Sequence, residues 1–209
     1  MTAASRVLPM FPLGIVHFPH VVLPLQVFEP RYRALTADCL EADREFGVVL
    51  IERGSEVGGG DSRFDVGTAT TIVEAAIDDR GMVRLETVGT RRIRVTRWLD
   101  EVPYPRAETV DVTPPVIGDE ELEALALAER EVRRALALRA ELDELVAPYN
   151  VVLDDDPARA LFQLAAVAPL GPADQQRLLS IENARGMLVL LAKLAEEEAD
   201  VLAQRLAGN

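Results

Sequence analysis

The sequence predicts an α+β protein of 209 residues, with a β-rich first half and a helical second half. Before residue 114, short segments rich in Val, Ile, Thr and Phe alternate with Gly, Asp and Pro, which is the pattern of strands and turns. After Pro114-Pro115, residues 119–146 contain neither proline nor glycine and repeat apolar residues at helical spacing. The change of pattern predicts two domains, 1–114 and 115–209.

The first half is expected to hold seven strands and one helix. Asp78-Asp79-Arg80-Gly81 has the residues of a tight turn, because Asp favours turn starts and Gly permits positive φ. The flanking segments should therefore form a hairpin. Arg31–Ala42 is the expected helix, inserted between strands. The expected strands are Val7–Met10, Val22–Val27, Gly47–Glu52, Gly67–Ile77, Met82–Val88, Arg91–Leu99 and Ala107–Thr113.

The second half is expected to be a bundle of four helices. Its first helix is Asp119–Val146, and Asp156 before Pro157 starts the next, since a carboxylate caps the helix and proline suits its first position. Gly171-Pro172 begins a short third helix. Ser180 is expected to cap the last helix, roughly Glu182–Leu206, with Glu182 favoured by the helix dipole. The last helix carries one apolar side: Leu188, Leu191, Leu194, Val201 and Leu202.

The composition is that of a globular protein, with 49% hydrophobic and 27% charged residues and a net charge of −13. An acidic chain is poorly suited to nucleic acid or to anionic membranes, because both require basic surfaces. Four prolines between Val7 and Phe28 exclude a membrane helix from that apolar stretch. The single Cys39 and the lack of a signal-peptide core predict a cytoplasmic location.

One segment has residues of the types that bind nucleic acid. Arg91, Arg92, Arg94 and Arg97 lie beside Trp98, and arginines next to an aromatic ring can stack on bases and contact phosphate. Acidic residues flank this segment, and the first half is itself net negative. No nucleic-acid partner is therefore expected.

Catalytic chemistry is not predicted. The P-loop of an ATPase needs a lysine after a glycine loop, and the only lysine, Lys193, lies in an apolar helical stretch. Ser180 and Lys193 would be roughly 20 Å apart along a helix, too far for a serine–lysine peptidase. His17 and His20 lack a third ligand for a metal, and are expected near the surface. The sequence thus predicts no enzyme, cofactor or metal.

The most distinctive segment is residues 10–33, MFPLGIVHFPHVVLPLQVFEPRYR. Its prolines and aromatic residues, with later segments of the chain, resemble the amino-terminal domain of the Lon protease family. The resemblance is strongest to the stand-alone bacterial form, which lacks the ATPase and peptidase modules. It covers nearly the whole chain. The matching segments include Pro12-Leu13, Phe18-Pro19, Leu23-Pro24-Leu25, Phe28-Glu29-Pro30-Arg31-Tyr32, Phe46–Ile51, Val66-Gly67-Thr68, Gly89–Val95, Tyr104–Ala107 and Asp174–Leu179.

The resemblance implies a PUA-like β pseudo-barrel followed by a helical bundle. It also implies a non-catalytic module that binds unfolded polypeptide or exposed apolar segments and acts with an ATP-dependent protease. The residues expected to bind are Phe18, Phe28, Glu29, Arg31 and Tyr32. These same residue types also build cores and lock turns, since apolar side chains are mostly interior.

Two other functions stay open. A small-ligand or regulatory module should show an enclosed pocket with convergent polar groups, whereas a peptide binder should expose a contiguous apolar patch. A protein that only pairs with itself or with a protease should leave an apolar stripe uncovered on its last helix.

Overall fold

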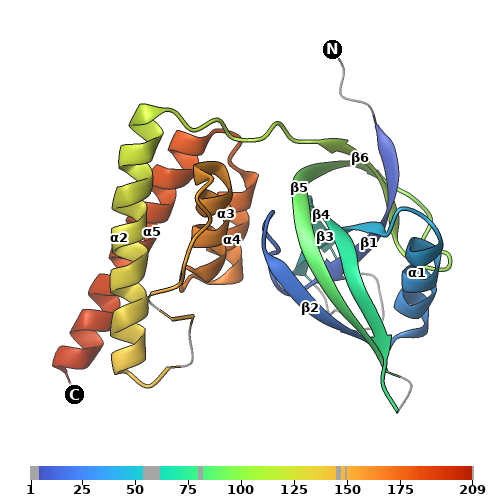
Figure 1. Ribbon diagram of the computed structural model, residues 1–209, viewed down its shortest axis with the longest axis horizontal. Coiled ribbons are helices and arrows are strands. Elements are labelled where there is room, and N and C mark those ends of the chain that lie inside the picture. The colour runs from blue at the N-terminus through green and yellow to red at the C-terminus, as the bar shows by residue number, and fades with distance from the viewer. Residues whose placement is uncertain (1–4, 54–61, 80–81, 145–146, 149, 209) are drawn as a thin grey trace. The chain divides into compact units, whose positions relative to one another are not determined.

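The computed structural model describes residues 5–53, 62–79, 82–144, 147–148 and 150–208. The chain forms two compact units, residues 1–114 and 115–209 (Figure 1). The first unit is β-rich and the second is helical, so the predicted α+β class is confirmed.

The described residues of the first unit form a mixed sheet of six strands with one helix, α1 (Pro30–Glu41). The strand order is β2-β5-β4-β3-β1-β6, and β6 pairs also with β5. This second pairing closes β5, β4, β3, β1 and β6 into a ring, the pseudo-barrel seen in Figure 1. The strands are β1 (Arg6–Leu13), β2 (Val22–Val27), β3 (Glu45–Arg53), β4 (Ser62–Ile77), β5 (Val83–Trp98) and β6 (Arg106–Asp111).

The expectation of two strands at Met82–Val88 and Arg91–Leu99 is wrong, because β5 runs through both. Thr70 pairs with Gly89 and Ala69 with Arg91, so Thr90 is an extra residue, a β-bulge. A bulge bends a strand without ending it. The two halves of β5 then pair with different strands: the first half with β2, the second with β6.

The expected turn joins β4 to β5. The Asp78 N–H donates to the Met82 carbonyl at 3.0 Å, and the Met82 N–H donates to the Asp78 Oδ1 at 2.9 Å. Arg80 and Gly81 lie outside the described residues.

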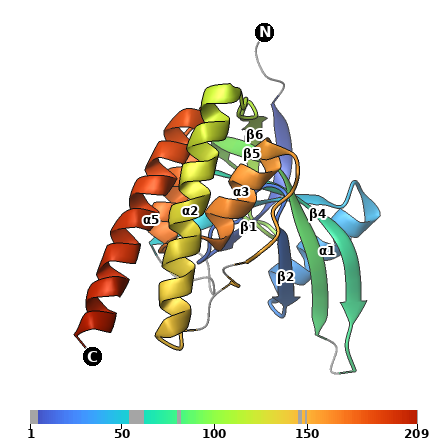
Figure 2. The same cartoon turned by 60° about the vertical axis from the view of Figure 1, so that its left-hand side comes forward.

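The second unit consists of α2 (Asp119–Glu141), α3 (Pro157–Val167), α4 (Pro172–Ser180) and α5 (Ala184–Ala207). Figure 2 shows α2 and α5 side by side. Ion pairs join them near both ends, Glu120 with Arg185 and Glu144 with Arg205. The helix α2 ends five residues before the predicted Val146, since Asp143 adopts a φ of 56°, outside the α-helical region.

The apolar side of α5 is largely as predicted. Leu188, Leu191 and Leu202 are fully buried, but Val201 is 53% exposed. Among the described residues of α5, the other exposed large apolar side chain is Val189, which lies twelve positions before Val201. Two side chains so far apart form no continuous stripe. No helix in the described part of the chain is long and apolar enough to cross a membrane.

One of the two predicted helix caps is confirmed. The Asp156 carboxylate accepts from the Ala158 N–H at 2.9 Å at the start of α3. The prediction for Ser180 is wrong: it is the last residue of α4, and its hydroxyl donates to the Gln176 carbonyl at 2.8 Å. The cap of α5 is Asn183, whose Oδ1 accepts from the Gly186 N–H at 2.7 Å. Glu182 precedes the helix and is not in its first turn.

Replacing Asn183 by Ala is expected to lower the free energy of unfolding by about 1 kcal/mol, because the capped N–H loses its acceptor. Ser180→Ala is the matched control and should lower the free energy of unfolding by less than about 0.5 kcal/mol, since it removes only bonds to Gln176 inside α4 and caps nothing. Urea unfolding followed by circular dichroism measures both. A larger loss for Ser180→Ala would contradict the assignment.

Candidate functional site

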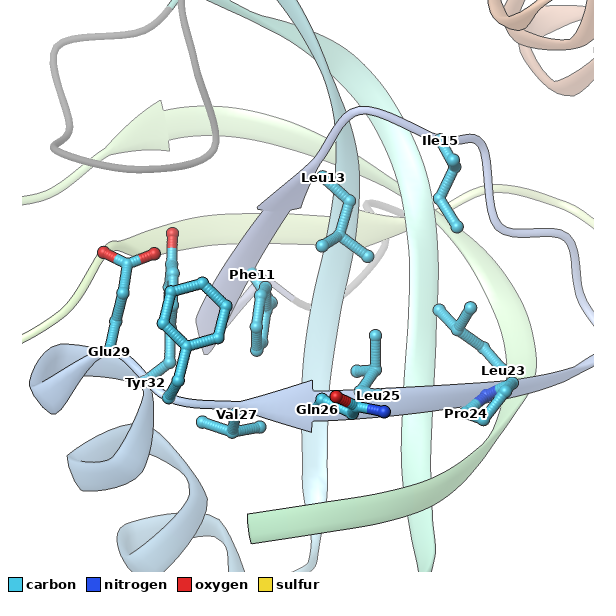
Figure 3. Close-up of a pocket in the computed structure, with 11 residues that line it drawn as sticks. Phe11, Leu13, Ile15, Leu23, Pro24, Leu25, Gln26, Val27, Glu29 and Tyr32 are labelled. Carbon is cyan, nitrogen blue, oxygen red and sulfur yellow. The ribbon is translucent and has the colours of Figure 1, made fainter. Parts of the chain in front are cut away.

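The first unit contains a hollow of about 250 Å³ between the end of β1 and the length of β2 (Figure 3). Its wall is mostly apolar, and its polar groups are the side chains of Gln26 and Glu29 and the Tyr32 hydroxyl. The lining residues are Phe11, Leu13, Ile15, Leu23, Pro24, Leu25, Gln26, Val27, Phe28, Glu29 and Tyr32.

The hollow lies where the barrel is incomplete. β6 pairs with β1 only at residues 6–9, while residues 10–13 of β1 pair with β3 alone. β2 pairs with β5 and with no other strand of the described residues. One edge of β1 and one edge of β2 therefore have no partner strand in the described part of the chain. We call the gap between them the seam.

Three of the five predicted binding residues line this hollow: Phe28, Glu29 and Tyr32. Phe28 is 59% exposed, although aromatic side chains are usually mostly buried. Tyr32 is buried and stacks on Phe11, with ring centres 4.0 Å apart and an angle of 11° between the rings. Such a stack is favourable beyond the area it buries. It gives the hollow a rigid end wall.

Arg31 supports this wall and does not line the hollow. Its Nε donates to the Glu29 carboxylate at 3.0 Å, and its guanidinium lies 4.5 Å from the centre of the Tyr32 ring. Both side chains of the pair are largely shielded from water. The pair neutralises the carboxylate beside the hollow, so the site is close to uncharged.

Phe18 is placed elsewhere, in the core. It is 1% exposed and does not line the hollow. Its loop is fixed to β5 by two backbone bonds, His20 N–H to the Gly89 carbonyl at 2.8 Å and Gly89 N–H to the Val21 carbonyl at 3.1 Å. A Cβ on Gly89 would lie 2.4 Å from the Phe18 carbonyl oxygen, so only glycine permits this approach. Phe18 shapes the fold and is not available to a ligand.

The expectation that both histidines lie near the surface is wrong for His17. This side chain is 4% exposed, and its Nε2 has no hydrogen-bond partner among the described residues. Burial lowers the pKa of His17 to about 4, since the charged form loses its hydration. No group of three or more His, Cys, Asp or Glu side chains in the described ranges is arranged to hold a metal ion.

Sequence reasoning missed most of the apolar wall. Residues 22–27 alternate between exposed and more buried positions until Val27, which is the pattern of a strand with one covered face. The sequence of this strand, VLPLQV, does not itself alternate apolar and polar residues, so it gave no signal for the covered face. The contribution of β1 could not be found from the sequence either, because it depends on the pairing of distant strands.

Three of the four arginines beside Trp98 bind neighbouring groups of the protein. Arg91 binds the carboxylates of Glu45 and Asp111, and the Nε contact with Asp111 is 2.8 Å. Arg97 pairs with Glu108. The charges of these two arginines are balanced within the sheet, and Arg92 is buried with its guanidinium donating to the Thr113 carbonyl.

The helical unit has a second hollow, of about 490 Å³, between α2 and the segment before α3. Two of its charged side chains bind each other: Arg133 pairs with Glu129 at 2.6 Å, and Arg133 also donates to the Val151 carbonyl at 3.0 Å. None of the predicted binding residues lies there. The seam hollow is therefore the better candidate.

Comparison with known proteins decides the family. Residues 7–197 match the ATP-dependent protease La (LON) substrate-binding domain. The chain belongs to the Lon substrate-binding domain family. The Lon protease of Escherichia coli K12 is 29% identical over 203 residues, which cover 93% of this chain and 25% of that protein. Lon protease 2 of Desulfotalea psychrophila is 27% identical over 199 residues, which cover 93% of this chain and 25% of that protein.

Solved Lon domains have the same fold. The crystal structure of a Lon N-terminal domain protein from Xanthomonas campestris matches with a TM-score of 0.63 and 25% identity, covering 89% of this chain and 96% of that one. The N-terminal domain of Lon protease from Mycobacterium avium complex matches with a TM-score of 0.67 and 17% identity, covering 91% and 98%. The predicted family and fold are confirmed. The chain spans about a quarter of the length of the curated Lon proteases that it matches.

Proposed function

We propose that this Lon-type domain is a non-catalytic binding module that captures exposed apolar segments of unfolded polypeptides in the seam hollow. The observation that carries the proposal is a mostly apolar, nearly uncharged hollow whose lining includes two exposed large apolar side chains, Ile15 and Phe28. Exposed apolar surface is costly in a folded protein, and where it gathers it marks an interaction site.

The size of the hollow favours a peptide over a small ligand. Small-molecule sites usually enclose about 300–1,000 Å³ and place several polar groups around the ligand. The seam hollow is smaller, at about 250 Å³, and Phe28 and Ile15 leave it open to solvent. Its one carboxylate, Glu29, is already paired with Arg31. These features suit apolar side chains of a longer chain.

The Lon context supports a further part of the proposal: the captured segments are passed to an ATP-dependent protease in the cytoplasm. The test is the degradation rate of an unfolded protein by the Lon protease of the same organism, with and without this chain. A rate that does not change would contradict the partnership and leave the binding proposal standing.

Binding itself is tested by fluorescence anisotropy. The probe is labelled α-lactalbumin, reduced and capped with iodoacetamide so that it stays unfolded, and the native protein is the control. Saturable binding of the unfolded form alone is expected. Phe28→Ser should weaken it about tenfold, since the variant loses the apolar contact that the phenyl ring makes.

The matched control is Ile77→Ser. Ile77 lies in the same unit and is 72% exposed, but it does not line the hollow. This variant should bind like the unmodified chain. Equal weakening by both substitutions would show non-specific adhesion, and absence of binding to the unfolded probe would contradict the proposed function.

A further inference from the structure

The outward edge of β2 can be assigned from its hydrogen bonds. The Leu23 carbonyl accepts from the Thr87 hydroxyl of β5 at 2.7 Å, and the Val21 carbonyl accepts from the Gly89 N–H. In an antiparallel pair, the N–H and C=O of one residue point to the same side, and successive residues alternate. The main-chain groups of residues 22, 24 and 26 therefore point away from β5.

The same reasoning applies to β1. The Met10 N–H donates to the Pro105 carbonyl at 2.8 Å, away from β3, so by alternation the main chain of Pro12 also points away from β3. Pro12 and Pro24 thus both stand on edges that face the seam. A strand tolerates proline only where its missing N–H is not needed for the sheet. Both prolines agree with this assignment.

The seam therefore offers main-chain groups as well as an apolar wall. On β2, the carbonyls of Val22, Pro24 and Gln26 can accept hydrogen bonds, and the amides of Val22 and Gln26 can donate them. The carbonyl of Pro12 stands on the opposite edge. A helix cannot use such groups, because its own main chain is already hydrogen-bonded, whereas an extended chain can.

Resting on the function proposed above, we propose that the captured segment binds in extended conformation, as an added strand on the outward edge of β2. Every second side chain of the segment enters the hollow, because side chains alternate along a strand. The preferred partner is an unfolded segment with uncharged apolar residues at every second position and no proline in the paired stretch. A preformed amphipathic helix is excluded.

A substitution on β2 tests the main-chain contacts. Gln26→Pro removes the outward N–H of residue 26 and leaves the pairing of β2 with β5 intact, as Pro24 already does. Gln26→Ala is the matched control, since it removes the same side chain and keeps the N–H. Thermal melts check that both variants fold. Gln26→Pro should bind unfolded α-lactalbumin at least about tenfold more weakly than Gln26→Ala.

A chemical probe gives the same test without altering the protein. The probe is an acetylated, amidated octapeptide of alternating leucine and threonine, with and without N-methyl groups on its four central residues. N-methylation removes backbone N–H donors from the peptide and makes the peptide more apolar. A strand-adding site should bind the methylated peptide at least about tenfold more weakly. A site that contacts only the side chains of the peptide should bind the methylated and unmethylated peptides equally well.

The outcomes separate the two proposals. If neither the unmethylated peptide nor unfolded α-lactalbumin binds, the proposed function fails and the strand-addition inference fails with it. If both bind, but the methylated peptide binds as tightly, strand addition is overturned and capture stands. If Gln26→Pro binds as well as Gln26→Ala, the β2 edge is not the site of addition. Should Gln26→Pro not fold, the peptide pair alone decides.

Discussion

Replacing Gly67 by Ala is expected to lower the free energy of unfolding by about 3 kcal/mol. Gly67 of β4 pairs with Val49 of β3, and a Cβ there would lie 2.1 Å from the Val48 carbonyl oxygen. The obstructing atom is main chain, so it can move only if the β3–β4 ladder separates. Gly47 differs, because its nearest neighbour is the flexible side chain of Met10.

Chemical unfolding followed by circular dichroism measures the effect. Gly171→Ala is the matched control, since a Cβ at Gly171 meets nothing within 4 Å. Gly171→Ala should lower the free energy of unfolding by at most about 1 kcal/mol, the usual range for a change at a helix cap. Similar losses for the two variants would show that β3 and β4 do not approach as closely as described.

The stability of the first unit is expected to fall by about 3 kcal/mol between pH 6.5 and pH 4 through His17 alone. The ordinary pKa of a histidine is 6.5, and burial lowers the pKa of His17 to about 4. Between these values the unfolded chain binds a proton at His17 and the folded chain does not. The unfolded state therefore gains stability as pH falls, and the effect levels off below pH 4.

The measurement is the free energy of unfolding at intervals across this pH range. His17→Leu removes the titrating group and should remove this slope, whatever its own stability. His20→Asn is the control that keeps the slope; His20 has a φ of 61°, a conformation that Asn adopts readily. Carboxylates paired in the folded state, such as Glu45, also lose stabilisation as pH falls through the ordinary carboxyl pKa of 4.5, since pairing lowers the pKa in the folded state, but this contribution is common to all variants. An unchanged slope in His17→Leu would contradict the assignment.

Local patterns predicted the local structure well. The strand Val22–Val27 has the predicted bounds, α1 differs by one residue at each end, and Asp156 caps α3. Each of these features depends on neighbouring residues alone. The resemblance carried by residues 10–33 correctly identified the family and the fold.

The errors have tertiary causes. The continuity of β5 depends on its pairing with β4 across Thr90, which no local pattern records. His17 is buried because its loop is fixed against Gly89, 69 positions after His20 in the chain. Ser180 and Asn183 are both good capping residues, and only the path of the chain between α4 and α5 decides between them. The hollow escaped prediction for the same reason, since β1 and β2 meet there without pairing.

Pro24 on the outward edge of β2 also makes this edge less favourable for a second copy of β2 than for a proline-free segment. A proline-free segment added to β2 forgoes one hydrogen bond, the one that Pro24 cannot donate. A second copy of β2, paired symmetrically about Pro24, forgoes two. Each hydrogen bond contributes a net value of about 1 kcal/mol, so pairing with a second copy of β2 is less favourable than pairing with a proline-free segment by about 1 kcal/mol. The edge that we propose for binding unfolded segments thereby disfavours pairing with a second copy of itself.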